Sequence, residues 1–278
     1  MSKKTITFRA SGNGALMTNA QGCTLTEKQT LALKTYDSKV IEGVSLTPAQ
    51  RKTYSDLKDK SKAPFQMSDT AKSYVRQIWL AREKGYWKPL KSKYLDKGIY
   101  SEEDAISLIS EVDGRFYVKN TERKILGNIT GECDINSTIS GKRIIQDTKS
   151  CWSPDTFMQS AMTLDNEWQG RCYMHLYDAD EFWLRHVLVD CPDHIYQGEI
   201  YKLKMQYNII DETLPEHSRL FDRLKTSSIY SDNPQYTPEE RVKKTIIYRD
   251  DNIFQELLDR IPAALDFYNQ MRLNGFTN

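Results

Sequence analysis

The sequence predicts an α/β protein with a central mixed β-sheet flanked by helices and a mainly helical N-terminal region. β-prone runs gather between residues 115 and 191, whereas helix-start signals and helical periodicity dominate on both sides of them. At 278 residues, the chain is long enough to bury a substantial core. We expect a single domain over 1–278, with a mainly helical N-terminal region at 1–97, a core at 98–191 and a helical C-terminal part at 192–278.

Charge balance and cysteine count bear on which partners and which stabilising groups the protein can have. With 39 basic and 38 acidic side chains, net charge gives no argument for a DNA partner, so any such surface must come from local clusters of lysines. The five cysteines are odd in number and form no C-x-x-C, which disfavours a disulfide framework and a zinc ribbon. Neither a membrane span nor a leader is evident, so we expect a soluble, cytoplasmic protein with no membrane partner.

The N-terminal region opens with a strand-like run and a small-residue turn that contains Ala10 and Ser11. Helices are expected from residue 24 to 62, where Thr47 and Pro48 supply an N-cap and a first-turn proline. Residues 68–86 have the apolar spacing of an amphipathic helix.

A basic stretch follows, in which Lys88, Lys91 and Lys93 alternate with Trp87 and Tyr94. Lysines interleaved with aromatics are typical of a groove that follows a phosphate backbone. A solvated basic loop beside core aromatics explains the same pattern, and both interpretations stay open.

The next helix starts at Ser101 and carries Glu102, Glu103 and Asp104 in its first turn. Acidic side chains there complement the helix dipole, so capping alone accounts for them. Two strand-like runs at 115–119 and 123–135 lead from this helix towards Asp134.

A hairpin is expected between the Asp134 segment and residues 143–150, with Ser140 and Gly141 in its turn. Side chains alternate along a strand, so Asp147 and Lys149 point to one face and the intervening threonine points to the other. Two carboxylates that converge beside a lysine suit Mg²⁺ and a water to be activated, because Mg²⁺ prefers oxygen ligands.

Beyond the hairpin, a helix carries Gln169 and Tyr173 on one face. Taken alone, Tyr173 is a core residue and Gln169 a surface residue. A further strand at 182–191, helices between 196 and 224 and a long amphipathic helix at 251–273 complete the prediction.

At these residues the sequence resembles the PD-(D/E)XK nuclease superfamily, in its RecB-like and phage lambda exonuclease-like branch. The family pattern is an acid on a helix, then an Asp, then (D/E)-x-K, then Q-x-x-x-Y. Its counterparts in this chain are Glu102, Asp134, Asp147 with Lys149, and Gln169 with Tyr173. Order and spacing agree. Two positions depart from the pattern: Cys133 stands where the family usually has Pro, and Asp147 where many relatives have Glu, but neither change removes a ligand type.

The resemblance implies a restriction-endonuclease-like fold with a catalytic core at 98–191. It implies that Glu102, Asp134 and Asp147 hold one or two Mg²⁺ (or Mn²⁺) ions, with Glu103 as the alternative to Glu102. Lys149 would then steady the attacking water or the developing charge, and Gln169 and Tyr173 would orient the DNA strand. By the same resemblance Ser11 is a phosphate-binding candidate beside the three lysines of the basic stretch.

The function implied is an exonuclease that resects linear double-stranded DNA in phage-type recombination, in a bacterial or phage-infected cell. A single-strand annealing protein and a homo-oligomeric ring are the expected partners. A structure-specific or CRISPR-adaptation-like endonuclease would use the same residues and stays open. A non-catalytic DNA-binding protein is the third hypothesis, and it is disfavoured because clustered carboxylates repel unless a cation is bound.

Overall fold

The computed structural model describes residues 5–20, 25–62, 65–89, 92–211 and 214–275. The chain divides into two compact units. The sheet unit comprises Met1–Gly14 and Lys88–Gln255, and the helical unit comprises Ala15–Trp87 and Glu256–Asn278.

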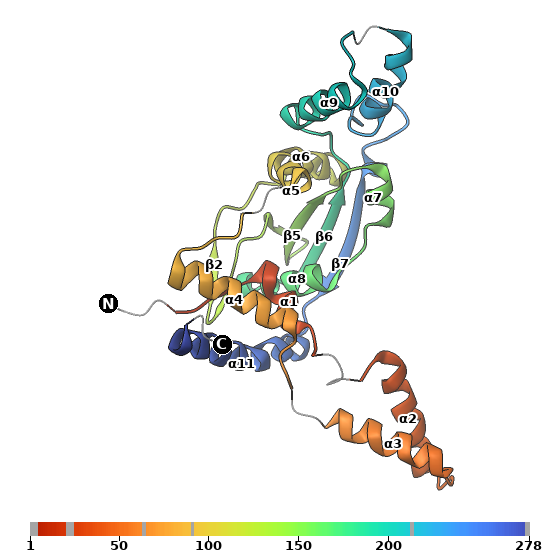
Figure 1. Ribbon diagram of the computed structural model, residues 1–278, viewed down its shortest axis with the longest axis vertical. Helices are drawn as coiled ribbons and strands as arrows, with labels where there is room; N and C mark the ends of the chain where they lie inside the picture. Colours follow the sequence, from red (N-terminus) through yellow and green to blue (C-terminus); the bar gives the residue numbers. More distant parts are fainter. Residues whose placement is uncertain (1–4, 21–24, 63–64, 90–91, 212–213, 276–278) are drawn as a thin grey trace. The chain divides into compact units, whose positions relative to one another are not determined.

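A four-stranded mixed sheet forms the centre of the sheet unit (Figure 1). Its strand order is β4-β5-β6-β7; β5 and β6 run parallel, and the two outer pairs are antiparallel. The strands are β4 (Ile135–Ile139), β5 (Lys142–Ser150), β6 (Glu181–Val187) and β7 (Val242–Tyr248). This mixed sheet, with helices on both of its faces, confirms the predicted fold class.

The β4–β5 hairpin forms at the predicted turn. Ser140 and Gly141 have φ values of 52° and 82°, and a two-residue turn with both φ positive matches the twist of the flanking strands. Ile139 pairs with Lys142 and Ile135 with Gln146. This register brings the residue before Ile135, which is Asp134, opposite Asp147.

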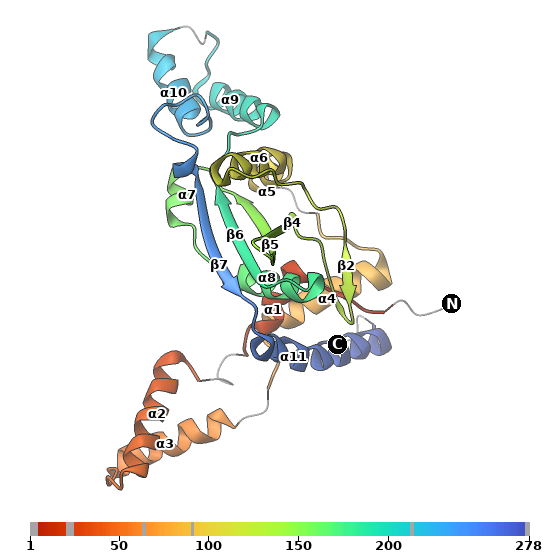
Figure 2. The same ribbon diagram turned by 180° about the vertical axis from the view of Figure 1, so that it is seen from behind.

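A second, smaller sheet has the order β1-β3-β2 and contains β1 (Phe8–Arg9), β2 (Lys124–Leu126) and β3 (Ile129–Gly131). Figure 2 shows β2 and β4 from behind. The strand expected at 115–119 was wrong: only Lys119 forms an isolated bridge, to Ile135. Phe116 and Val118 are 90% and 65% exposed. These two apolar side chains therefore pack neither against a partner strand nor into a core.

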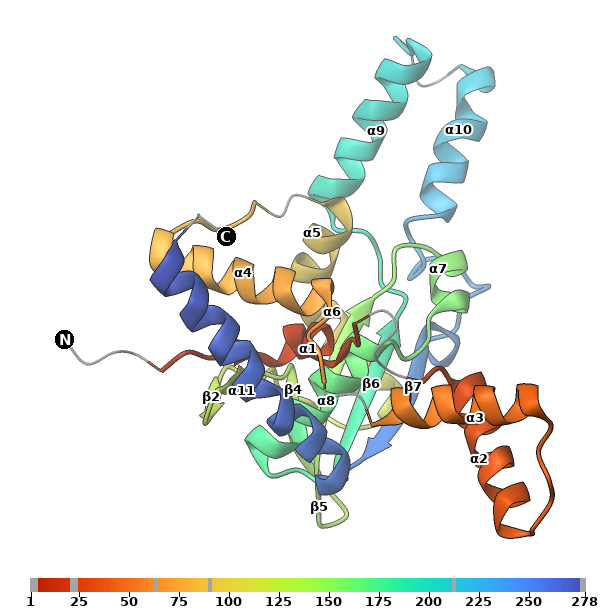
Figure 3. The same ribbon diagram turned by 60° about the horizontal axis from the view of Figure 1, so that its bottom comes forward.

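Helices cover both faces of the larger sheet. Those of the sheet unit are α5 (Lys93–Tyr100), α6 (Glu102–Asp113), α7 (Pro154–Gln159), α8 (Leu164–Tyr177), α9 (Asp193–Tyr207) and α10 (Pro215–Thr226), with short 3₁₀ turns at Ala10–Gly12 and Glu239–Arg241. Gly170 lets α8 approach β6, because a Cβ at Gly170 would lie 2.1 Å from the Phe182 ring. On the opposite face α6 packs Ala105 and Ile109 against Ile135 and Val187. α9 and α10 lie side by side (Figure 3).

The helical unit contains α2 (Glu27–Ile41), α3 (Pro48–Ser61) and α4 (Asp69–Lys84) and most of α11 (Asp251–Asn274). The short α1 (Asn13–Met17) lies where the two units meet along the sequence. Thr47 caps α3 with its side chain and Pro48 occupies the first turn, as predicted. No helix in the part of the chain described here is long and apolar enough to cross a membrane.

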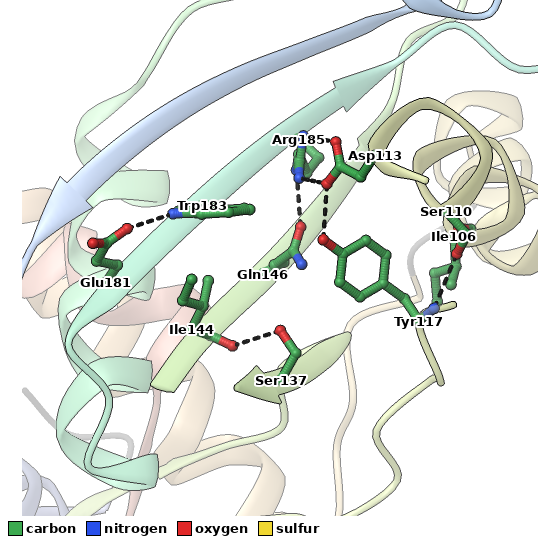
Figure 4. A network of polar contacts seen from close by, with 10 residues as sticks. All are labelled: Ile106, Ser110, Asp113, Tyr117, Ser137, Ile144, Gln146, Glu181, Trp183 and Arg185. Atoms are coloured by element: carbon green, nitrogen blue, oxygen red, sulfur yellow. Dashed lines mark hydrogen bonds and ion pairs between the residues drawn. The ribbon is translucent and has the colours of Figure 1, made fainter. Parts of the chain in front are cut away.

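A buried polar network ties α6 to the sheet (Figure 4). The Arg185 side chain, 1% exposed, forms an ion pair with Asp113 at the end of α6 and donates from Nε to Gln146 Oε1 at 2.8 Å. Tyr117 donates its hydroxyl to Asp113 Oδ2 at 2.8 Å. Since α6 begins at Glu102, this network fixes the helix that brings Glu102 to the sheet.

A buried lysine holds α5 in place. The Lys97 side chain is 1% exposed, and its Nζ donates to the Trp152 carbonyl at 3.3 Å while lying over the rings of Trp152 and Tyr230. Burial without a carboxylate partner in contact lowers the pKa of Lys97 to about 8.

We expect Lys97→Met to remove a pH dependence of stability. Between pH 8 and 10.5 the unfolded chain still binds the proton that folded Lys97 has released, so this lysine by itself raises the free energy of unfolding with pH by about 2 to 3 kcal/mol. The difference between wild type and variant in urea unfolding at several pH values isolates this contribution, because the buried thiols with raised pKa values act equally in both. Lys58→Met is the matched control, because Lys58 also lies over a tyrosine ring but is exposed. A wild-type slope in Lys97→Met would contradict the prediction.

Candidate active site

Asp147 and Lys149 project from β5 on the face that carries α8. Lys149 Nζ lies 2.5 Å from Asp147 Oδ2, and the Asp147 residue is 2% exposed. Burial raises the pKa of Asp147, and Lys149 opposes that rise. Burial acts to lower the pKa of Lys149, but Asp147 and the acids around it outweigh this and leave it raised. The pair therefore places a cation beside a carboxylate that is costly to ionise alone.

Asp134 lies directly before β4 and is held by the β5 backbone. Its Oδ2 accepts hydrogen bonds from the Thr148 backbone N at 2.6 Å and from Thr148 Oγ1 at 2.8 Å. Burial, followed by repulsion from Asp147, raises the pKa of Asp134 to about 6, although the Thr148 donors counteract both. The two aspartates thus share one electrostatic environment, as the hairpin predicted.

Glu102 approaches from the start of α6. Ser101 does not cap this helix with its side chain; its Oγ donates to the Lys97 carbonyl at 2.7 Å and is hydrogen-bonded to Ser150 Oγ at 2.9 Å, which ties the helix start to the end of β5. Glu102 lines the same cavity as the aspartates, and Lys119 Nζ lies 3.0 Å from its Oε2. Glu103 is exposed and does not line this cavity. The geometry therefore favours Glu102 over Glu103.

Gln169 and Tyr173 join this group from α8. Gln169 Nε2 lies 2.9 Å from Asp147 Oδ1 and 3.0 Å from the Tyr173 hydroxyl, and its Oε1 accepts from Lys149 at 3.3 Å. Burial raises the pKa of Tyr173, so the phenol stays protonated. A Cβ at Gly131 would lie 2.6 Å from the Tyr173 ring, so the glycine makes room for it. Gln169, a surface residue by periodicity alone, is buried here and connects the aspartate to the tyrosine.

All six predicted catalytic side chains line a cavity of about 450 Å³. Ser11 lines it as well. Tyr94 of the basic stretch and Thr148 line it too, together with residues that had not been expected there: Arg9, Leu95, Ile99, Arg123, Thr130 and Glu132. The cavity therefore combines an acidic floor with basic and apolar groups.

Two of the predicted DNA-binding lysines, Lys88 and Lys93, lie outside the lining of the cavity. Lys93 forms an ion pair with Glu199 at 2.7 Å and lies over the Trp152 ring. Lys88 is exposed, and Lys91 is outside the described residues. Neither Lys88 nor Lys93 lines the cavity, and a contact of either with DNA remains a prediction.

Some of the missed residues left a signal in the sequence. Glu132 precedes Asp134 by two positions, so strand alternation would have placed both side chains together. Glu132 pairs with Arg123 at 3.1 Å. Lys119 and Arg9 reach the site through contacts that are distant in sequence, for which no local pattern exists.

The donor set fits a hard divalent cation. Carboxylate oxygens are the ligands that Mg²⁺ prefers, and the buried Asp147 Oδ2 accepts no hydrogen bond of regular geometry despite its ion-pair contact with Lys149. Within the described ranges no three acidic, histidine or cysteine side chains lie close enough together to enclose a metal. Each of the three acids instead contacts a donor of the protein itself: Lys119, Thr148 or Lys149.

No protein-family model and no curated protein matches the sequence. Solved structures do match. A phage-related exonuclease from Haemophilus somnus 129PT has 24% identity and a TM-score of 0.61, over 96% of this chain and 95% of that one. The alkaline exonuclease LHK-Exo from Laribacter hongkongensis has 11% identity and a TM-score of 0.50, over 95% of this chain and 88% of that one, and its complex with dAMP matches equally. The chain therefore shares its fold with phage-related and alkaline exonucleases.

Proposed function

We propose that this protein is a divalent-metal-dependent deoxyribonuclease of the PD-(D/E)XK type, acting as an exonuclease on linear double-stranded DNA. The convergence of Glu102, Asp134, Asp147 and Lys149 on one cavity, with Gln169 and Tyr173 behind them, carries this proposal. The fold shared with two exonucleases supports it, as does the dAMP complex of LHK-Exo, since dAMP is a deoxynucleoside monophosphate.

In the proposed reaction, Glu102, Asp134 and Asp147 would hold Mg²⁺ or Mn²⁺, which would polarise the scissile phosphate and acidify a water. Lys149 Nζ orients the attacking water and stabilises the negative charge that develops on the phosphate oxygens. Gln169 fixes the Asp147 carboxylate through its 2.9 Å contact and keeps the Tyr173 hydroxyl pointed at the site. Arg9 and Arg123 bind flanking phosphates, while exposed Tyr94 offers a face for stacking a base.

The proposed biological role is resection of DNA ends in phage-type recombination with a single-strand annealing partner, in the cytoplasm of a bacterial or phage-infected cell. A homo-oligomer that encircles the duplex fits this role.

Digestion of linear and closed-circular double-stranded DNA tests the proposal. With Mg²⁺ or Mn²⁺ we expect loss of linear DNA only, abolished by EDTA and by Asp147→Asn. Nicking or linearisation of the circle would establish an endonuclease instead. Absence of cutting on every substrate would overturn the proposal in favour of a DNA-binding protein.

A further inference from the structure

A second lysine contacts the acidic floor of the cavity from outside it. Lys119 Nζ lies 3.0 Å from Glu102 Oε2, and the two side chains are 40% and 24% exposed. Glu102 lines the cavity, whereas Lys119 does not. Lys119 is therefore placed to act on the carboxylate, and it is not placed to touch a substrate inside the cavity.

The backbone around Lys119 is fixed to the same segment that carries Asp134. Lys119 forms a β-bridge with Ile135, and the Asn120 backbone N donates to the Asp134 carbonyl at 2.7 Å. Asn120 Nδ2 also donates to the Cys133 carbonyl at 3.0 Å. The backbone of Lys119 is therefore held close to Asp134, and its side chain extends from there to Glu102 on α6.

Lys119 differs from the groups that hold the neighbouring acids. Asp134 is held by uncharged donors of Thr148, and the Lys149 ammonium that pairs with Asp147 is itself part of the proposed chemistry. Lys119, by contrast, lies outside the cavity and contacts Glu102, which is the one of the three acids that belongs to a helix. Because the pair is partly exposed, it is weak enough to be broken by a competing ligand.

We propose that Lys119 is a positioning residue that competes with the divalent cation for Glu102 Oε2 and thereby sets the cation concentration that the site requires. This inference rests on the proposed function. The ammonium group 3.0 Å away occupies one lone pair of this oxygen and repels a divalent cation that approaches it, so metal binding at Oε2 works against the ion pair. Lys119 aligns Glu102 and weakens metal binding at the same time.

The test is Mn²⁺ affinity, measured from the electron paramagnetic resonance signal of free Mn²⁺ without DNA. We expect Lys119→Met to bind Mn²⁺ about five-fold more tightly than wild type, the scale of a partly exposed ion pair. Lys119→Arg should keep wild-type affinity. Lys142→Met is the matched control, since it breaks an ion pair of Lys142 with Glu181, 2.7 Å long, whose residues do not line the cavity.

Thermal unfolding supplies a second readout that a merely structural lysine would not produce. In EDTA, Lys119→Met should unfold at a lower temperature than wild type, yet Mn²⁺ should raise its Tm by more. A lysine with only a structural role would lower Tm equally in both conditions.

A double substitution separates the possible failures. In a Glu102→Gln background, Lys119→Met should no longer change Mn²⁺ affinity, because the lysine acts through that carboxylate. If wild type binds Mn²⁺ and Asp147→Asn does not, but Lys119→Met binds no more tightly, this inference alone fails. If wild type binds no Mn²⁺, the proposed function fails together with it.

Discussion

Lys149→Met is expected to lower the rate of DNA cleavage by about 10²- to 10³-fold, the usual effect of losing a group that stabilises developing charge. Methionine keeps the apolar stem, so packing along β5 changes little. In the protein without metal, Asp147 also loses the ammonium group 2.5 Å away that opposes its raised pKa, so the pKa of Asp147 should rise further. Initial rates on linear DNA with saturating Mn²⁺ measure the effect on cleavage.

Lys142→Met is the control for this prediction as well. It removes a lysine from the start of the same strand, where the ion pair with Glu181 is partly exposed, and should leave the rate within two-fold or so, because such pairs contribute little. A Lys149→Met rate close to that of the control would contradict a role for Lys149 in the chemistry.

Asp113→Ala is expected to destabilise the sheet unit by about 3 to 5 kcal/mol. The substitution leaves the buried Arg185 side chain, 2% exposed, without its carboxylate, and Tyr117 loses the acceptor of its hydroxyl at 2.8 Å. A buried charge without a partner lowers the free energy of unfolding far more than the loss of a surface ion pair does. Urea unfolding followed by circular dichroism measures the difference in the free energy of unfolding.

Asp178→Asn gives the comparison, because the Asp178 side chain is 81% exposed in its ion pair with Arg249 and asparagine tolerates the positive φ of 52° at this position. We expect it to cost less than about 1 kcal/mol. Replacing both charged partners, as Asp113→Leu with Arg185→Met, should recover much of the lost stability, since neither charge is then buried unpaired. If Asp113→Ala costs no more than Asp178→Asn, the network in Figure 4 does not hold α6.

Local patterns predicted the parts of the site that are close in sequence. The Ser140–Gly141 turn fixes the hairpin, and period two along β5 places Asp147 beside Lys149. The four-residue spacing of Gln169 and Tyr173 likewise placed both on one face of α8. In each case the geometry follows from the backbone of one or two elements.

Contacts between distant segments could not be derived in this way. The lysine bound to Glu102 comes from a bridge to β4, and Arg185 is 72 residues from its partner Asp113. β1 pairs in parallel with β3, far along the chain, and brings Arg9 to the cavity. The burial of Gln169 also depends on contacts between distant segments. Helical spacing predicts which residues share a face of α8, but it does not predict which elements pack against that face.

The hydrogen bonds that orient Asp134 affect which substitutions the surrounding positions can accept. One donor to its carboxylate is the main-chain N–H of Thr148, and its own carbonyl is bound by the main-chain N–H of Asn120. Main-chain donors survive every substitution except proline. The alignment of the second acid is therefore encoded in part by the path of the backbone, and any substitution at positions 120 and 148 other than proline keeps these two main-chain donors, although it loses the side-chain contacts of Asn120 and Thr148.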